Sequence, residues 1–212
     1  MHESIHLSDL REGLSELQVF LPEEVESKLL QYIDLLYKWN KTYNLTALRN
    51  KFQMLTHHIF DSLSILNELD NIDSLMDVGS GGGLPGIPIA ITKPDLKVVL
   101  VDSNSKKTTF LSQVVIELAL SNVEVKQSRI EVLQGMKFDM LVSRAFSELS
   151  DFVNMTKQLL SDEGCWLAMK GTYPYEELSK LPDWIVVDWI KPISVPQINA
   201  ERHIVKMLFN KD

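Results

Sequence analysis

The sequence predicts an α/β fold: a mostly parallel β-sheet covered by helices on both faces, with a helical extension in front of it. Two observations lead to this prediction. Apolar residues recur with helical spacing over residues 1–70, whereas short apolar runs alternate with helical segments over residues 71–212. Such alternation is typical of parallel sheets that are buried on both faces. We therefore expect a helical extension, 1–70, and a sheet domain, 71–212, packed as one compact unit.

The helical extension is predicted from two stretches. Pro22 suits the first turn of a helix, and Glu23 and Glu24 suit the positive end of its dipole. A second helical stretch is expected over residues 51–69. In the first stretch, the apolar residues with 3.6-residue spacing are Val25, Leu29, Ile33 and Leu36.

Seven short apolar runs predict the strands of the sheet. Helical segments separate the first five runs, so these strands are expected to be parallel. No long helix lies between the last two runs, which predicts an antiparallel finish. The runs are Leu75–Val78, Val98–Val101, Val123–Val125, Met140–Val142, Trp166–Met169, Ile185–Val187 and Ile204–Phe209.

The composition narrows the class of protein. Of the 212 residues, 45% are hydrophobic and 24% are charged, which excludes a disordered chain. No apolar run is long enough for a transmembrane helix, and the acidic first residues show no secretory signal. The single cysteine, Cys165, excludes an intrachain disulfide framework. We expect a cytoplasmic monomer without a membrane anchor.

Glycines cluster directly after the first predicted strand. Five of the nine glycines lie within residues 79–86, and Pro85 can start the helix that follows. Glycines let the backbone approach a ligand closely, and a helix N-terminus presents free N–H groups. The arrangement therefore predicts a nucleotide-type cofactor site, with a packed turn that binds nothing as the alternative.

The register of the glycines favours S-adenosylmethionine (SAM) over a dinucleotide. Gly79 lies at the strand end, which gives the pattern Asp77-x-Gly79-x-Gly81-x-Gly83. The dinucleotide frame, which would start at Gly81, begins too far from the strand, although it stays an alternative. Asp102 ends the second strand, where a carboxylate can accept both hydroxyls of a ribose in either kind of site.

A basic stretch interrupts an otherwise acidic chain. The net charge is −8, yet no acid lies between Asp34 and Asp61. Such a stretch can present a basic face to a polyanion, and a solvated loop is the alternative. Its basic residues are Lys38, Lys41, Arg49, Lys51, His57 and His58.

Several unusual strings resemble one known family in the same order along nearly the whole chain. They are Lys38-Trp39-Asn40-Lys41-x-Tyr43-Asn44-Leu45-Thr46, His58-Ile59-x-Asp61-Ser62, Asp77-Val78-Gly79-Ser80-Gly81, Gly83-Leu84-Pro85-Gly86-Ile87-Pro88, Asp102-Ser103, Gln127-Ser128-Arg129, Ser143-Arg144-Ala145-Phe146, Lys170-Gly171 and Glu201-Arg202-His203. The family is that of the bacterial RsmG (GidB) methyltransferases, which methylate N7 of a guanosine in 16S ribosomal RNA. The resemblance implies a class I SAM-dependent methyltransferase fold with a seven-stranded sheet, its last strand antiparallel, plus an N-terminal helical extension. It also implies SAM as cofactor and the small ribosomal subunit as partner.

The resemblance assigns roles to single residues. Gly79 and Leu84 resemble turn residues that contact the cofactor, and Ile130 and Glu131 resemble the pair beside its adenine. Arg144 resembles an arginine among the family's cofactor contacts. The other expected cofactor-binding residues are Asp77, Gly81, Gly83, Asp102 and Ser103.

The residues show no catalytic apparatus for amine or carbon methylation. Ser143-Arg144-Ala145-Phe146 occupies the place where amine methylases often carry Asn/Asp-Pro-Pro-aromatic. Cys165 lies in an apolar run and is expected in the core rather than as a nucleophile. Guanine N7 has a lone pair and no proton, so positioning and exclusion of water suffice. We expect Arg144 and Lys170 to supply that positioning.

Some of these residues have a second interpretation. Arg144 can contact SAM, the guanine or a phosphate, or form a structural ion pair. Phe146 can stack on the base or in the core. Arg202 and His203, at the start of the last strand, can bind RNA phosphate or form a cap or salt bridge. A metal site at His57, His58 and Asp61 is not expected, because only the latter two share a helix face.

An acidic protein that binds RNA needs a local basic patch. We expect this patch around the mouth of the cofactor site. Its members are Lys38, Lys41, Arg49, Lys51, Arg129, Arg144, Lys170 and Arg202, with His203 as a further RNA contact. Three rival functions stay open: a small-molecule methyltransferase, a nicotinamide-dependent oxidoreductase that uses the later glycine frame, and a non-catalytic ribosome-assembly factor.

Overall fold

The seven predicted strands form one β-sheet in this computed structural model, which describes residues 5–144, 146 and 148–211. They are β1 (Ser74–Val78), β2 (Lys97–Asp102), β3 (Val123–Gln127), β4 (Phe138–Ser143), β5 (Leu160–Lys170), β6 (Ile185–Pro192) and β7 (His203–Phe209). Their order across the sheet is β3-β2-β1-β4-β5-β7-β6. The first five are parallel, and β7 runs antiparallel to β5 and β6, which confirms the predicted sheet. Ala145 of the string quoted above lies outside the described residues.

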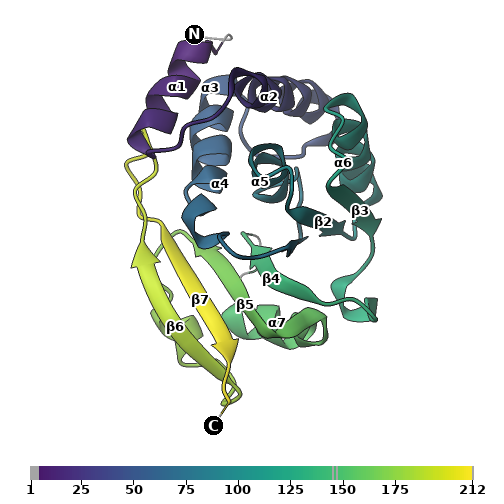
Figure 1. Cartoon of the computed structure of the whole chain (residues 1–212), viewed down its shortest axis with the longest axis vertical. Coiled ribbons are helices and arrows are strands. Elements are labelled where there is room, and N and C mark those ends of the chain that lie inside the picture. Colours follow the sequence, from purple (N-terminus) through teal and green to yellow (C-terminus); the bar gives the residue numbers. More distant parts are fainter. Residues whose placement is uncertain (1–4, 145, 147, 212) are drawn as a thin grey trace.

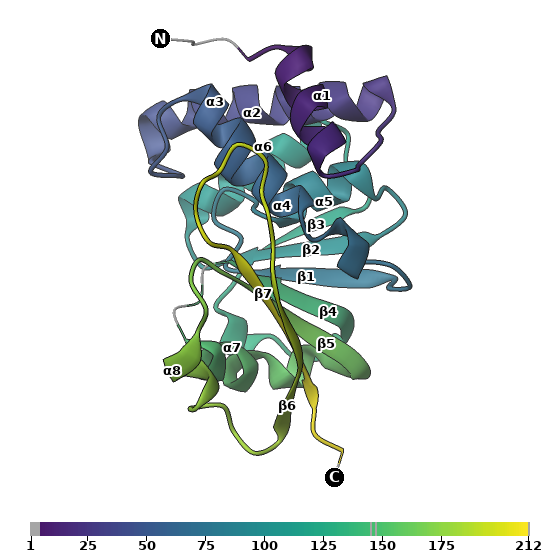
Figure 2. The ribbon, with the colours of Figure 1, turned by 90° about the vertical axis from the view of Figure 1, so that its left-hand side faces the viewer.

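The helices gather in two regions (Figures 1 and 2). The N-terminal helices lie together with the two that follow β1 and β2, and the two later helices lie near β4 and β5. Among the described residues, the α-helices are α1 (Leu7–Glu16), α2 (Glu23–Tyr43), α3 (Lys51–Met54), α4 (Asp61–Leu63), α5 (Gly86–Thr92), α6 (Ser105–Glu117), α7 (Leu149–Thr156) and α8 (Tyr175–Leu178).

The two faces of the sheet belong to two hydrophobic cores. Neighbouring strand residues point to opposite faces. Leu75 packs in one cluster with Leu29 of α2 and Phe60, so the N-terminal extension shares its core with the sheet. Met76 packs in the other cluster with Phe152 of α7.

The start of α2 agrees with the prediction. Pro22 precedes the helix in an extended conformation, and acidic residues occupy the first turn. The helix ends at Asn44, which adopts a left-handed conformation with φ of 50°, and its N–H donates to the carbonyl of Asn40 at 3.2 Å. The chain then turns into a loop that leads to α3.

The helix predicted over residues 51–69 is not regular. After α3 the chain makes a π-helical turn, Leu55–Phe60, then α4 and a 3-10 turn, Leu66–Glu68. π-Helical turns are rare and frequently occur at functional sites. This one carries His57 and His58 at the edge of a cavity described below.

One expected helical segment is much shorter than predicted. Between β3 and β4 the described residues form only a 3-10 turn, Ile130–Val132, instead of a helix. β3 is an edge strand, and none of its residues is fully buried. Little apolar surface is therefore left there for a helix to cover.

The strand order reverses between β1 and β4, and ligands bind at such points in open α/β sheets, beyond the carboxyl ends of the strands. Gly79 follows β1, and Arg144 follows β4. Because β7 is antiparallel, its first residue, His203, pairs with Lys170 at the end of β5. The start of β7 therefore joins the same edge.

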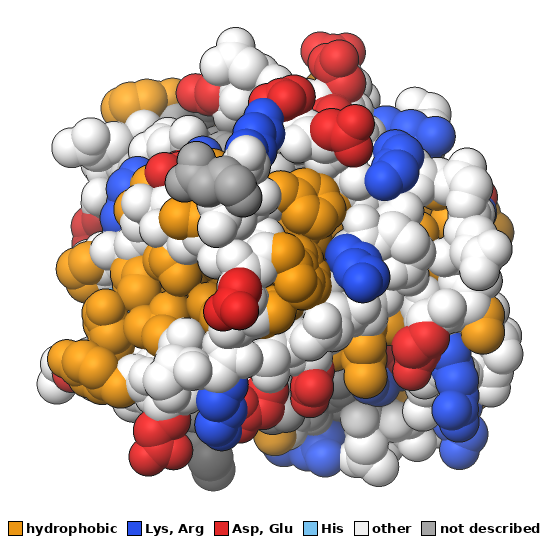
Figure 3. Space-filling view, turned by 90° about the horizontal axis from the view of Figure 1, so that it is seen from below, with side chains coloured by type: hydrophobic (Ala, Val, Ile, Leu, Met, Phe, Trp, Pro, Cys, Tyr) orange, Lys and Arg blue, Asp and Glu red, His pale blue; other side chains and the backbone are white. Residues whose placement is uncertain are grey.

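The surface at the lower end of the molecule is not uniformly charged. Figure 3 shows hydrophobic side chains gathered in one broad area, with single acidic and basic side chains around it. Among the side chains coloured there, no continuous basic surface is seen on this face. Within the described residues, none of the helices combines the length and the apolar character needed to cross a membrane.

Candidate functional site

The turn after β1 depends on glycines with different tasks. Gly79, Gly81 and Gly83 have φ of 73°, 58° and 91°, values that side chains rarely adopt. A Cβ on Gly83 would lie 2.5 Å from Ile87 Cγ1 and 2.8 Å from Leu111 Cδ2. A Cβ on Gly81 would meet no atom closer than 3.9 Å. Gly83 is thus needed for packing, whereas Gly81 presents open backbone.

Asp77 supports this turn from below. Its side chain is buried, and Oδ2 accepts a hydrogen bond from the Gly86 N–H at 2.9 Å. Oδ1 has no partner among the described residues, and burial raises the pKa of this carboxyl to about 7. Asp77 therefore lies under the turn and does not line the cavity beside it.

Tyr32 of α2 ties the N-terminal extension to the turn. Its hydroxyl is buried and donates to the carbonyl of Gly82 at 2.5 Å. This contact could not be predicted from the sequence, because a tyrosine on the apolar face of a helix is also an ordinary core residue. The extension thus stabilises the turn directly.

Asp102 stands at the end of β2, opposite the turn. Its Oδ2 accepts from the Gly81 N–H at 3.0 Å, and its Oδ1 accepts from the Asn104 N–H at 2.8 Å. Lys107 Nζ lies 3.6 Å from Oδ2. The carboxylate is thereby held at the mouth of the turn, which is the position expected for a ribose ligand.

A cavity of about 450 Å³ opens beside this turn; we call it the glycine-turn cavity. It brings together five of the ten residues expected to bind the cofactor. Those residues are Gly79, Asp102, Ser103, Ile130 and Glu131, with Arg129 and Phe146 also at its wall. Gly81, Gly83 and Leu84 lie in the turn itself, outside this wall, and Leu84 is buried.

These features suit a nucleoside cofactor better than a plain turn. The backbone at Gly81 is open, a carboxylate stands at the strand end, and Asp77 keeps one buried oxygen without a partner among the described residues. Phe146 stacks on Phe152 of α7 at 5.2 Å between ring centroids, so its ring belongs to the core as well as to the wall.

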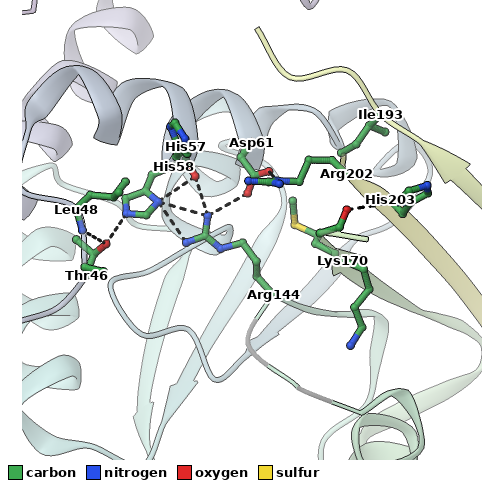
Figure 4. Close-up of a pocket in the computed structure, with 13 residues that line it drawn as sticks. Thr46, Leu48, His57, His58, Asp61, Arg144, Lys170, Ile193, Arg202 and His203 are labelled. Carbon is green, nitrogen blue, oxygen red and sulfur yellow. Dashed lines mark hydrogen bonds and ion pairs between the residues drawn. The ribbon is translucent and has the colours of Figure 1, made fainter. Parts of the chain in front are cut away.

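A second cavity of about 420 Å³ lies on the other side of the reversal point; we call it the arginine cavity (Figure 4). The loop after α2 and the π-helical turn form one wall, and the ends of β4 and β5 and the start of β7 form the other. Its polar lining residues are Thr46, His57, His58, Asp61, Arg144, Lys170, Arg202 and His203.

Asp61 joins two arginines in this cavity. Its Oδ2 accepts from Arg144 Nη1 at 3.0 Å, and its Oδ1 accepts from Arg202 Nε at 3.2 Å. The Asp61 side chain is 4% exposed, whereas the arginine side chains are 25% and 24% exposed. A buried carboxylate therefore holds two partly exposed arginine side chains, one directly after β4 and one directly before β7.

His58 completes the network in its neutral form. Its Nε2 contacts Thr46 Oγ1 at 2.8 Å, and its Nδ1 lies 3.4 Å from both terminal nitrogens of Arg144. Burial, and then the positive charge of Arg144, lower the pKa of His58 to about 3. The imidazole is thus uncharged near neutral pH.

Lys170 and His203 line the same cavity and have partners of their own. Lys170 Nζ donates to Glu177 Oε2 at 2.7 Å and to the carbonyl of Phe146 at 3.0 Å. In Figure 4 its ammonium points away from the two arginines. His203 lies edge-on to Tyr173, with 5.5 Å between ring centroids. Glu177 was not anticipated from the sequence, because α8 carries no recognisable motif.

The remaining predicted basic residues are not gathered at the cavities. Lys38, Lys41, Arg49 and Lys51 line neither of the two. Lys51 pairs with Asp34 at 2.8 Å. The structure therefore brings together only Arg144, Lys170, Arg202 and His203 of the expected RNA contacts, with Arg129 in the neighbouring cavity.

Arg49 and Asn40 shape the loop that carries Thr46. Arg49 donates to Asn44 Oδ1 at 2.7 Å and to the carbonyl of Asn40 at 3.3 Å. Asn40 is buried, donates to the carbonyl of Leu48 at 2.7 Å and accepts from the Thr46 N–H at 2.9 Å. Thr46, the last residue of the string that begins at Lys38, thus lines the arginine cavity, and Asn40 holds its backbone in place.

Comparison with known proteins identifies the family. The family model described as rRNA small subunit methyltransferase G matches residues 25–205. The ribosomal RNA small subunit methyltransferase G of Chromobacterium violaceum is 51% identical over 206 residues, which cover 97% of this chain and 99% of that protein.

The chain belongs to the rRNA small subunit methyltransferase G family. The protein of the same name from Neisseria meningitidis serogroup B is 50% identical over 196 residues, which cover 92% of this chain and 95% of that protein. A solved SAM-dependent methyltransferase from Aquifex aeolicus shares the fold, with a TM-score of 0.59 and 18% identity over 74% of this chain and 93% of that one. The class I methyltransferase fold implied by the resemblance is thus confirmed.

Proposed function

We propose that this protein transfers a methyl group from SAM to N7 of a guanosine in the 16S rRNA of the small ribosomal subunit. Membership of the rRNA small subunit methyltransferase G family supports the reaction class, the cofactor and the substrate. The choice of the N7 atom follows from the resemblance to this family, and the chemistry of the arginine cavity agrees with it.

The glycine-turn cavity is the proposed SAM site. Gly79 and Ser103 would lie beside the ribose of the cofactor. Asp102 would accept hydrogen bonds from the ribose hydroxyls, and Ile130 and Glu131 would flank the adenine. When bound, SAM supplies a methyl group on a sulfonium, which a nucleophile can displace. Asp77, Gly83 and Leu84 keep the turn in shape from behind.

The two side chains that contact Arg144 in the described part of the chain, those of His58 and Asp61, include no good general base, and this observation supports the N7 assignment. His58, with a pKa lowered to about 3, is a weak base. Asp61 is ion-paired with two arginines, and Lys170 is paired with Glu177. An exocyclic amine would have to lose a proton, whereas N7 reacts through its lone pair and needs only positioning.

The structure also supports roles in RNA contact. Arg144 and Arg202 expose part of their guanidinium groups to the cavity, and Arg129 lies at the wall of the neighbouring one. Lys38 and Lys41 are exposed near the end of α2. We assign all five to binding of the RNA by a monomer that acts in the cytoplasm on the small subunit, without a metal. The N-terminal extension, 1–70, and the sheet domain, 71–212, act as one unit.

Methyl transfer from labelled SAM tests this function. Small subunits and bare 16S rRNA from cells that lack this activity are incubated with the protein, and digested nucleosides are separated. Label in 7-methylguanosine alone is the expected result. Label in another nucleoside would contradict the N7 assignment, and label only in free metabolites would favour a small-molecule methyltransferase.

A further inference from the structure

The arginine cavity contains a charge arrangement that the methyl transfer itself does not explain. Asp61 carries one negative charge and contacts two guanidinium groups, and the neighbouring His58 is neutral. Lys170 and Glu177 cancel each other's charge. The cluster of Asp61, Arg144 and Arg202 thus holds a net charge of about +1, which suits one monoanionic group.

Some N–H groups of the two arginines are engaged by other residues of the described chain, and others are not. Asp61 occupies Arg144 Nη1 and Arg202 Nε, and the carbonyl of Glu201 occupies Arg202 Nη1. Within the described part of the chain, Arg202 Nη2 and Arg144 Nε have no hydrogen-bond partner. Guanidinium N–H groups bind the oxygens of phosphate well, and here one buried carboxylate holds two guanidinium groups.

The place of the cluster in the sheet favours RNA over the cofactor as the source of the anion. The start of β7 lies three strands from β1, about 14 Å away at normal strand spacing. The glycine turn does not line the arginine cavity. Arg202 therefore reaches an anion on the substrate side of the reversal point.

We propose that Asp61 is a positioning residue that holds Arg144 and Arg202 as one anion-binding subsite for a phosphodiester of the RNA beside the methylated nucleotide. This inference rests on the proposed function, because it takes the substrate to be RNA. It assigns Asp61 a task in substrate binding that neither the fold nor the glycine turn requires.

The Asp61→Asn variant separates positioning from simple electrostatics. Loss of a negative charge beside a phosphate would strengthen RNA binding if Asp61 only tempered the charge of the cavity. If Asp61 positions the arginines, RNA binding weakens instead, by about tenfold, because each guanidinium loses its anchor. SAM affinity is expected to stay unchanged.

Arg202→Gln is the second variant. Its side chain is partly exposed, and the buried Asp61 stays paired with Arg144 when it is replaced. We expect its RNA affinity to fall about tenfold and the slope of log affinity against log salt to decrease by about one. The losses in the double variant are expected to be less than additive, because both act through one subsite.

Glu26→Gln provides the matched control. Glu26 is also a buried carboxylate bonded to an arginine, Arg11, but it lines neither cavity. Glu26→Gln shows how much stability is lost with an internal ion pair. Thermal unfolding of all variants shows which of them fold. RNA affinity of Glu26→Gln should match that of the unchanged protein.

Direct binding of small-subunit RNA and of SAM is measured beside methylation, so that the outcomes are distinct. Weaker RNA binding with unchanged SAM affinity in both variants supports the proposal. Unchanged or tighter RNA binding by Asp61→Asn overturns it, as does a loss of SAM affinity with unchanged RNA binding, which would assign the anion to the cofactor's carboxylate. Absence of methylation by the unchanged protein would instead contradict the proposed function, whatever the variants bind.

Discussion

At the scale of single residues, similar sequence features turn out to have different physical roles. Gly81 and Gly83 both adopt positive φ, but only a Cβ at Gly83 would collide with its neighbours. Asp77 and Asp102 both lie near the ends of strands, yet one is buried under the turn and the other lines a cavity. The sequence pattern predicts that these residues form a site, and their surroundings decide what each one does.

Two glycine variants separate binding from packing. Gly81→Ala should lose about 1 kcal/mol of stability from its backbone conformation and bind SAM markedly more weakly. Gly83→Ala should lose more stability than Gly81→Ala, because its Cβ also collides with Ile87 and Leu111. Urea unfolding and calorimetric SAM titration measure the two effects.

Gly135→Ala is the matched control for these glycines. Gly135 has φ of 74° and open space around it, far from the turn in sequence. Gly135→Ala should lose only the stability that the positive φ costs, and it should keep full SAM affinity. Equal SAM affinity of the Gly81 and Gly135 variants would contradict the role given to Gly81.

The buried His58 predicts how stability depends on pH. Its pKa in the folded protein is about 3, below the ordinary 6.5, so the unfolded chain takes up a proton first as the pH falls. Its neutral form therefore contributes stability above pH 6.5 that is lost on acidification toward pH 3, by up to about 1.4 kcal/mol per pH unit. Between pH 7 and pH 5, the free energy of unfolding measured in urea should decrease less for His58→Gln than for the unchanged protein. His203→Gln, which removes a more exposed imidazole, is the control, and equal decreases in all three proteins would contradict this account.

At the scale of elements, the strands could be predicted and the shapes of the connections could not. Apolar runs specify buried strands because their side chains must leave water, so all seven were found. The π-helical turn and the 3-10 turn after β3 left no local signal, because they depend on how much surface the neighbouring elements cover. The pairing of Arg144 with Asp61, 83 residues earlier, likewise depends on tertiary packing.

The loop that Asn40 holds in place leads to a prediction at this scale. Asn40→Ala would leave the carbonyl of Leu48 and the N–H of Thr46 without their partner, at a cost of about 2 kcal/mol. Methylation should fall too, since Thr46 holds His58 in the arginine cavity. Thr42→Ala, at an exposed site on the same helix, is the control and should change stability by less than about 0.5 kcal/mol. Equal unfolding midpoints for both variants would refute the role of Asn40.

At the scale of the whole molecule, the negative net charge has to be reconciled with RNA binding. The net charge is −8, but Arg144, Lys170 and Arg202 at the proposed site are already paired with acids of the same chain. Figure 3 likewise shows no continuous basic surface on the lower face among the side chains coloured there. Binding should then depend on a few phosphate contacts and on the shape of the assembled subunit, rather than on a broad basic field.

The exposed lysines of α2 test this view. Replacement of both Lys38 and Lys41 by Ala should weaken RNA binding and lower the salt slope by about two, with kcat unchanged. Lys97→Ala, at the opposite edge of the sheet from the cavities, should have no effect. If the double variant kept the salt slope of the unchanged protein, these lysines would not face the RNA.

The most direct test of the account is a chemical map of the methylated atom in cells. Borohydride and aniline cleave RNA at 7-methylguanosine, so 16S rRNA from cells that lack the native activity should stay intact at the target. Expression of this chain should restore one cleavage at a single guanosine, and expression of Gly81→Ala should restore little. Intact 16S rRNA in cells that express the folded, unchanged protein would contradict N7 methylation as its function.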